Sequence, residues 1–140
     1  RLYGVDGAQR IFDAHVVIVG LGGVGSWSAE ALARSGVHRL TLIDMDHVAE
    51  SNINRQIHAL ESTLGMAKVT AMKERIGQIN PECVVHTVDD FVTPENWLPL
   101  LNDLDFISVN TQSFGGDSMA KEIEFFLHEV ALTYLYIIVL

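Results

Sequence analysis

The sequence predicts a single α/β domain over residues 1–140 with a mainly parallel sheet. Residues 15–20, "HVVIVG", form a short apolar, β-branched run that ends in glycine and is typical of a strand buried on both faces. Residues 26–35 have a helical pattern before Gly36, a suitable C-terminal cap, and residues 38–44, "HRLTLID", indicate a second strand. A strand, a glycine turn, a helix and a strand within about 30 residues make a βαβ unit, which favours a parallel sheet with a right-handed crossover. The predicted class is therefore a Rossmann-like, doubly wound fold, incomplete in its C-terminal half.

The remaining chain continues to alternate between helices and strands. A helix is expected to begin near Gly65, because Val69, Met72, Ile76 and Ile79 recur at helical spacing and would face a core. The other expected elements are a strand at 83–88, a helix from Thr93, a strand at 104–110 and a helix at 117–129. No repeat or linker divides these elements into separate domains.

Composition and charge narrow the classes of function. The chain has 18 Asp and Glu against 9 Lys and Arg, a formal charge of −9, so nonspecific attraction to nucleic acid or anionic lipid is not expected. A nucleic-acid partner would need a local basic patch, to which Arg34, Arg39, Lys73 and Arg75 could contribute. The single cysteine, Cys83, is expected to be a buried structural residue, and its isolation suits a cytosolic location.

The two ends of the chain do not predict a stable membrane span. The first residues carry charges, including Arg1 and Asp6, and lack the apolar core of a signal peptide. The apolar tail, residues 130–140, is too short to cross a bilayer as a helix. We expect a buried strand or helix end there, with peripheral membrane association or a partner contact as the alternative.

The stretch "GLGGVG" contains Gly20, Gly22, Gly23 and Gly25 and satisfies the G-x-G-x-x-G pattern between a strand and a helix. In that context glycines allow a tight turn, and the amides at the helix start can face phosphate, although a purely structural turn is the alternative. Asp44 ends the second strand, where a carboxylate can accept hydrogen bonds from a ribose, or serve as a capping or turn aspartate. An NAD-dependent dehydrogenase fits these features as well as an ATP enzyme does.

Polar residues that follow the second strand favour a nucleoside triphosphate. They are Ser51, Asn52, Asn54, Arg55 and Lys68. A triphosphate carries roughly three to four negative charges, for which Arg55 offers a planar fork and Lys68 a compact charge. Each cation alone could be a solvated surface residue. Together they change a dinucleotide site into a candidate triphosphate site.

Several motifs, in order and spacing, resemble known families. "GLGGVGS", "LIDMD", "SNINRQ" and "GMAKV" resemble the E1-like activating-enzyme superfamily, which adenylates carboxylates with ATP. "RLYG", "GGVGSWSAEALARSG", "LIDMDHV", "NRQIHAL", "QINPEC" and "VDDFVTP" are similar to the bacterial tRNA threonylcarbamoyladenosine dehydratase branch. The resemblance extends over residues 1 to about 101, and 102–140 is divergent or truncated.

The resemblance implies a reaction and its participants. ATP would adenylate the carboxylate of N6-threonylcarbamoyladenosine at tRNA position 37, and the side chain's own nitrogen would close a cyclic hydantoin. The glycines would lie against the nucleotide, Asp44 would hold the ribose, and Ser51, Asn52 and Arg55 would reach the phosphates. Lys68 would act at the reacting phosphate, so Arg55 and Lys68 are the expected catalytic residues. The resemblance also implies Mg²⁺, a tRNA substrate, a homodimer, and cysteine-desulfurase or sulfur-acceptor proteins as partners.

The family pattern fails after the fourth expected strand. The family places a Mg²⁺-supporting aspartate at its end, and the spacing from Lys68 puts Gln112 there. A neutral amide is a poor ligand for a hard cation, so either Asp117 is recruited or metal binding is impaired. Asp105 begins the strand and does not end it. We therefore assign no metal ligands and expect a fragment or a diverged copy.

Three other classes of function stay open. A sulfur-carrier-protein adenylyltransferase would use the same ATP site, but it often carries paired CxxC motifs, and here there is only Cys83. An NAD(P)-binding oxidoreductase would bind nicotinamide without using Arg55 or Lys68. A noncatalytic nucleotide-binding or dimerisation module is the fourth possibility. Residues expected to play no part in a site are His15, His38, His58 and His86, which lack ligand spacing, and Trp27 and Trp97, which should pack.

Overall fold

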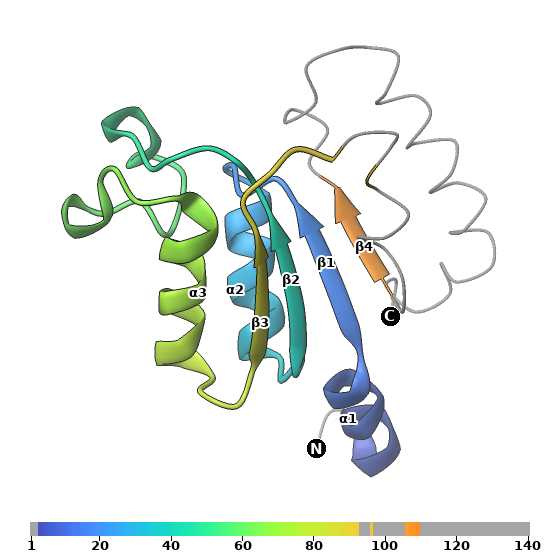
Figure 1. Cartoon of the computed structure of the whole chain (residues 1–140). Helices are drawn as coiled ribbons and strands as arrows, with labels where there is room; N and C mark the ends of the chain where they lie inside the picture. The colour runs from blue at the N-terminus through green and yellow to red at the C-terminus, as the bar shows by residue number, and fades with distance from the viewer. Residues whose placement is uncertain (1–2, 93–95, 97–105, 110–140) are drawn as a thin grey trace. The chain divides into compact units, whose positions relative to one another are not determined.

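The computed structural model describes residues 3–92, 96 and 106–109. Its helices are α1 (Gly4–Asp13), α2 (Gly25–Arg34) and α3 (Lys68–Ile79), with two short 3-10 helices, Glu50–Asn52 and Glu61–Thr63. The strands are β1 (His15–Val19), β2 (Arg39–Ile43), β3 (Val84–Val88) and β4 (Phe106–Val109). The four strands expected from the sequence all form; β1 and β3 are one residue shorter than expected, and β2 is two residues shorter. Figure 1 shows their arrangement.

The strands make one sheet in the order β3-β2-β1-β4, and every neighbouring pair is parallel. This confirms the βαβ prediction and the Rossmann-like class. The chain builds outward from β1 through β2 to β3 and then places β4 on the other side of β1 (Figure 1). Ligands of such sheets bind beyond the carboxyl ends of the strands, where the direction of building reverses. The ends of β1 and β2 are therefore the first place to look for a site.

One face of the sheet packs against α2 and α3. The shared core contains Ile18, Leu40 and Leu42 from the strands and Met72 and Ile76 from α3, all fully buried. Truncating either α3 residue to alanine would cost about 2–5 kcal/mol, because the close-packed neighbours cannot collapse into the cavity. β1 is buried on both of its faces, as its apolar run predicts.

Two glycines with positive φ delimit the helices. Gly36, at φ 92°, follows the end of α2 and confirms the predicted cap. Gly65, at φ 82°, does not begin a helix, so that prediction was wrong by three residues. The backbone of Val48 pairs on both sides of this turn, accepting from the Gly65 amide and donating to the Met66 carbonyl. This pairing keeps the chain extended until α3 begins.

Other expectations need correction. Trp27 was expected to pack, but it is 54% exposed. Cys83 is only half-buried, and burial raises the pKa of its thiol. Ile79 is partly buried, whereas the other three apolar positions of α3 are buried as predicted. Helix α1 was not predicted; none of its residues is buried, and Phe12 stacks on His38 with ring centroids 4.4 Å apart.

Some expectations concern positions outside the described residues. They are the helices from Thr93 and over 117–129, the tail 130–140, and Trp97, Asp105, Gln112 and Asp117. Within the described part, no helix has the length and apolar character needed to cross a membrane.

Candidate functional site

The glycine loop joins β1 to α2 beyond the carboxyl ends of the strands, which together are called here the carboxyl edge of the sheet. Gly20 has φ 86°, and its amide donates to the carbonyl of Ile43 at the end of β2. A Cβ at Gly25 would lie 1.8 Å from the Gly20 carbonyl oxygen, so only glycine permits this approach of the helix to the strand. No side chain caps the start of α2, where Val24 is the N-cap residue. The helix dipole therefore presents its positive end at this edge.

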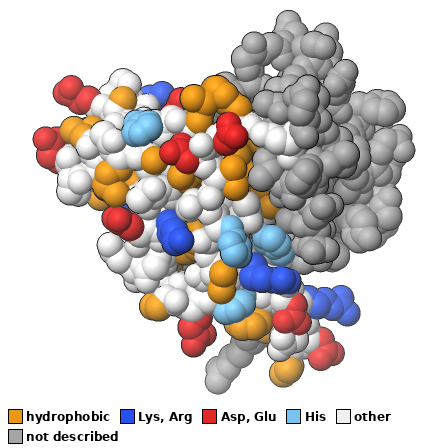
Figure 2. Space-filling view, in the orientation of Figure 1, with side chains coloured by type: hydrophobic (Ala, Val, Ile, Leu, Met, Phe, Trp, Pro, Cys, Tyr) orange, Lys and Arg blue, Asp and Glu red, His pale blue; other side chains and the backbone are white. Residues whose placement is uncertain are grey.

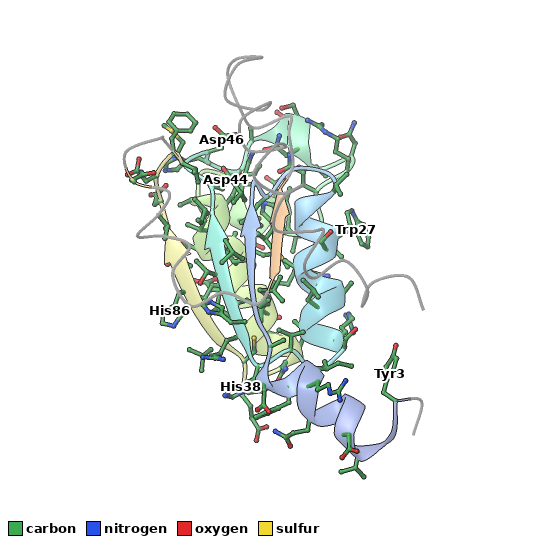
Figure 3. The ribbon with its side chains drawn as sticks, turned by 90° about the vertical axis from the view of Figure 1, so that its right-hand side faces the viewer. Tyr3, Trp27, His38, Asp44, Asp46 and His86 are labelled. Atoms are coloured by element: carbon green, nitrogen blue, oxygen red, sulfur yellow. The ribbon has the colours of Figure 1, made fainter. Side chains whose placement is uncertain are left out.

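Asp44 anchors the glycine loop to β2. Its buried carboxylate accepts hydrogen bonds from the amide of Leu21 at 2.6 Å and the amide of Asp46 at 2.8 Å. These two hydrogen bonds are typical of a turn aspartate, one of the roles that the sequence left open for Asp44. Each carboxylate oxygen keeps further acceptor capacity, so the contact with a ribose stays a prediction. Figure 3 labels Asp44 and Asp46 near the same edge.

Lys68 is the first residue of α3, which confirms its predicted place in the first helical turn. Its side chain is 7% exposed, and its Nζ lies 2.9 Å from Oδ2 of Asp46, whose side chain is 66% exposed. The Lys68 amide also donates to the Asp46 carbonyl at 2.9 Å. The pair therefore holds a buried ammonium next to a carboxylate that solvent can reach. An anion arriving at this edge could replace the carboxylate as the partner of Lys68.

Arg55 lies against the glycine loop although it is far away in sequence. A Cβ at Gly23 would be 3.6 Å from the Arg55 side chain, in ordinary van der Waals contact. Its Nη1 donates to the Ser51 carbonyl at 2.7 Å and to Oδ1 of Asn54 at 2.9 Å. The indole of Trp27 donates to the Arg55 carbonyl at 3.0 Å. No pattern in the sequence indicates this use of Trp27, because an isolated tryptophan in a helix usually packs.

The polar cluster after β2 divides into two kinds of residue. Asn52 is buried, and its Oδ1 accepts from the Ala49 amide at 2.9 Å, which closes the first 3-10 helix. Asn54 is exposed and holds Arg55, and Ser51 is exposed and contributes its carbonyl. These bonds shape the loop that carries Arg55. Direct phosphate contacts from Ser51, Asn52 and Asn54 stay predictions.

Two buried polar side chains follow Arg55 without hydrogen-bond partners among the described residues. They are Gln56, through Oε1, and His58, through both ring nitrogens. His58 is 1% exposed, and burial, followed by the charges of Lys68 and Arg75, lowers its pKa to about 4. His58 is therefore neutral near pH 7. Sequence reasoning placed it outside the site, and its setting in "IHAL" carries no signal of its proximity to two cations.

Cations expected to form a basic patch have other partners. The buried carboxylate of Glu30 binds Arg75 at 2.5 Å and Arg34 at 2.8 Å. The Arg75 guanidinium holds the pKa of Glu30 below its usual value, against the opposing effect of burial. Arg39 donates to the Asp13 carbonyl. In the part of the chain that the structure describes, no group of three or more His, Cys, Asp or Glu residues could hold a metal ion.

The fold and this edge define the class of protein: a Rossmann-like α/β domain whose glycine loop faces cations from the segments after β2. A model of the ThiF family matches residues 1–115, and the chain belongs to this family. The tRNA threonylcarbamoyladenosine dehydratase of Escherichia coli K12 is 62% identical over 96 residues, covering 69% of this chain and 36% of that protein. The chain thus spans about a third of this curated relative.

Solved structures agree with this assignment. The E. coli tRNA N6-threonylcarbamoyladenosine dehydratase TcdA in complex with AMP matches with a TM-score of 0.84 and 46% identity, over 93% of this chain and 52% of that chain. Its complex with ATP matches with a TM-score of 0.83 and 46% identity, over 93% and 53% of the two chains. The resemblance to the dehydratase branch of the E1-like superfamily is therefore confirmed.

Proposed function

We propose that this chain carries the ATP site of a tRNA threonylcarbamoyladenosine dehydratase. The observation that carries the proposal is that Arg55 lies on the glycine loop and Lys68 is buried beside Asp46, both beyond the ends of parallel strands. The relatives support the same function, since they are named as this dehydratase and one was solved with AMP and with ATP. An NAD(P)-binding enzyme would leave both cations without a role.

The proposed reaction has two steps. A carboxylate oxygen of the modified adenosine attacks the α-phosphorus of ATP, and the bond to pyrophosphate breaks. A nitrogen of the same side chain then attacks the acyl carbon, the cyclic product forms, and AMP leaves. The second step is intramolecular, so proximity supplies much of its rate and no cysteine nucleophile is needed.

Arg55 and Lys68 are assigned to the phosphates. Arg55 is fixed by Ser51 and Asn54, so its fork is oriented before ATP arrives. Lys68 exchanges the Asp46 carboxylate for a phosphate oxygen of higher charge. Cations held in place stabilise the charge that develops on the leaving pyrophosphate more than they stabilise bound ATP, which lowers the barrier.

Mg²⁺ is proposed to enter with ATP. It is commonly held by phosphate oxygens, water and one or two carboxylates, and it neutralises phosphate charge when bound. The exposed carboxylate of Asp46 could supply one such ligand, which fits this mode of binding. We also propose a tRNA substrate, a homodimer, a cytoplasmic location, and cysteine-desulfurase or sulfur-acceptor partners, each on the grounds of the family alone.

Calorimetric titration of the chain with ATP and Mg²⁺, and separately with NAD⁺, tests this proposal. Saturable ATP binding should be lost in Arg55→Ala and in Lys68→Ala. The matched control is Lys73→Ala, which removes an exposed lysine from the same helix as Lys68 and should bind like the unchanged chain. Stronger binding of NAD⁺, or equal ATP affinity in all three variants, would overturn the assignment.

A further inference from the structure

We infer that Glu30 and Arg75 are positioning residues that set the distance between the glycine loop and Lys68, an inference that rests on the proposed ATP site. Glu30 lies on α2 and Arg75 on α3. These two helices begin at the two sides of the site, one directly after the glycine loop and the other at Lys68 itself. A link between the helices is therefore a link between the parts that would hold ATP.

The link is short and buried on one side. Arg75 Nε lies 2.5 Å from Oε2 of Glu30, and the side chains are 29% and 9% exposed. The other oxygen, Oε1, binds Arg34 at 2.8 Å, which is on the same helix as Glu30 and 59% exposed. The carboxylate thus has two cationic partners, but only Arg75 joins different elements. Arg34 orients Glu30 within α2 and does not connect α2 to α3.

Arg75 is also on the same side of α3 as Lys68. Seven residues are close to two helical turns, so the two side chains leave the same face about 10 Å apart along the axis. The buried ring of His58 experiences the charges of both cations. Arg75 therefore joins Glu30 from the face of α3 that also carries Lys68.

An ion pair suits this task better than an apolar contact would. Apolar side chains slide across one another at little cost, whereas a charged hydrogen bond has a preferred distance and direction. Apolar contacts already hold α2 and α3 together through Ala29, Ala33, Met72 and Ile76 in the shared core. The Glu30 to Arg75 bond adds a fixed register along the helices, and the register decides how far Lys68 lies from the glycine loop.

The test compares two ligands that share a base and differ in phosphates. ATP affinity is measured by calorimetry and adenosine affinity by ligand-observed NMR, for the unchanged chain, Arg75→Ala, Arg75→Lys and the matched control Arg34→Ala. In Arg75→Ala, ATP affinity should fall about tenfold, because a small misplacement weakens contacts to phosphate, while adenosine affinity stays within about twofold. Arg75→Lys should recover part of the ATP affinity, and Arg34→Ala should leave both ligands unaffected.

The remaining outcomes distinguish a failure of this inference from a failure of the proposed function. If the unchanged chain binds ATP but Arg75→Ala loses affinity for ATP and adenosine alike, the bond is merely structural and the inference fails. It fails equally if Arg75→Ala and Arg34→Ala behave the same. If the unchanged chain does not bind ATP, the proposed function is wrong and this inference with it. If circular dichroism shows that Arg75→Ala does not fold, Glu30→Gln replaces it, because glutamine keeps the shape of the side chain. The affinities of Glu30→Gln for ATP and for adenosine are then judged in the same way.

Discussion

The carboxyl edge of the sheet, where the strands end, and the amino edge, where they begin, are built in different ways. At the carboxyl edge, buried Asp44 and Asn52 accept hydrogen bonds from backbone amides, and buried Lys68 donates to the carboxylate of Asp46. At the amino edge, α1 has no buried residue; Phe12 stacks on His38, Ile11 packs against the core, and Asp13 accepts a hydrogen bond from Arg39. Figure 2 shows histidine and basic side chains gathered on one face, and Figure 3 labels His38 beside α1.

This difference shows where buried polar side chains shape the structure. A buried polar group is costly unless its partners are well placed, so it is retained where loop geometry must be set. The amino edge also has a polar contact, between His15 and Thr41, but the aromatic and aliphatic residues of α1 there are exposed or half-buried. Changes at the carboxyl edge should therefore cost more, and should affect ligand binding, whereas changes at the amino edge should affect stability slightly.

The largest effect is expected for Gly25→Ala. The added Cβ would meet the Gly20 carbonyl at 1.8 Å, so α2 must move away from β1. We expect a loss of about 3 kcal/mol in the free energy of unfolding, measured by urea denaturation, together with loss of ATP binding. Gly77→Ala is the control: this position in α3 has open space around it and should gain about 0.5–1 kcal/mol. Similar values for the two variants would contradict the close packing of the loop.

A pH effect of similar size should come from His58. Its pKa is about 4 when folded, below the usual 6.5, so the unfolded chain binds more protons between these values. The stability due to neutral His58 is present above pH 6.5 and is lost as pH falls toward 4, by about 3 kcal/mol in total. His58→Leu should remove this part of the pH dependence in urea titrations at a series of pH values. The exposed His86→Gln serves as control, and equal slopes in both variants would refute the burial of His58.

Asp44→Asn should have a smaller effect on stability. Its amide can accept from only one of the two backbone donors that the carboxylate now satisfies, at Leu21 and Asp46. One buried N–H loses its partner, at a cost of about 2 kcal/mol in the free energy of unfolding. Amide hydrogens should also exchange faster at Leu21 or at Asp46, whichever amide loses its acceptor. Unchanged exchange at both amides would show that Asp44 does not anchor the loop.

The smallest effect should come from the amino edge. Phe12 is 42% exposed and stacks on His38, so Phe12→Ala should cost about 1 kcal/mol in urea denaturation. Affinity for ATP should not change, because α1 is at the far end of β1 from the glycine loop (Figure 1). A loss of ATP affinity here would break the distinction between the two edges.

The fold was predictable where local pattern and burial agree. β1 and β2 are apolar runs that lie in the core, and the glycine pattern between β1 and α2 permits few alternatives. Helix α1 was missed although Val5, Ala8 and Ile11 recur at helical spacing, and none of its residues is buried. The start of α3 was misplaced because the pairing of Val48 with Met66, a contact distant in sequence, decides it.

The roles of the candidate site residues stay predictions, and their arrangement was only partly predictable. Spacing after β2 identified Arg55 and Lys68, but the contact of Arg55 with Gly23 spans 32 positions and depends on the folded loop. Asn52 was predicted to contact phosphate; its Oδ1 accepts from the Ala49 amide, a bond that the sequence did not indicate, and the phosphate contact stays a prediction. No local pattern distinguishes a ligand-binding asparagine from one that caps a turn. No local pattern indicated the bond between Glu30 on α2 and Arg75 on α3 either.

The most direct test of the account is a map of ATP binding by backbone amide NMR. On titration with ATP and Mg²⁺, the shifts should concentrate at residues 20–26, 44–46, 51–56 and 68, and amides of α1 and of residues 38–39 should stay in place. Such a map would establish the carboxyl edge as the nucleotide site. Shifts centred on the amino edge, or larger shifts with NAD⁺ than with ATP, would contradict the central claim that Arg55 and Lys68 form a triphosphate site.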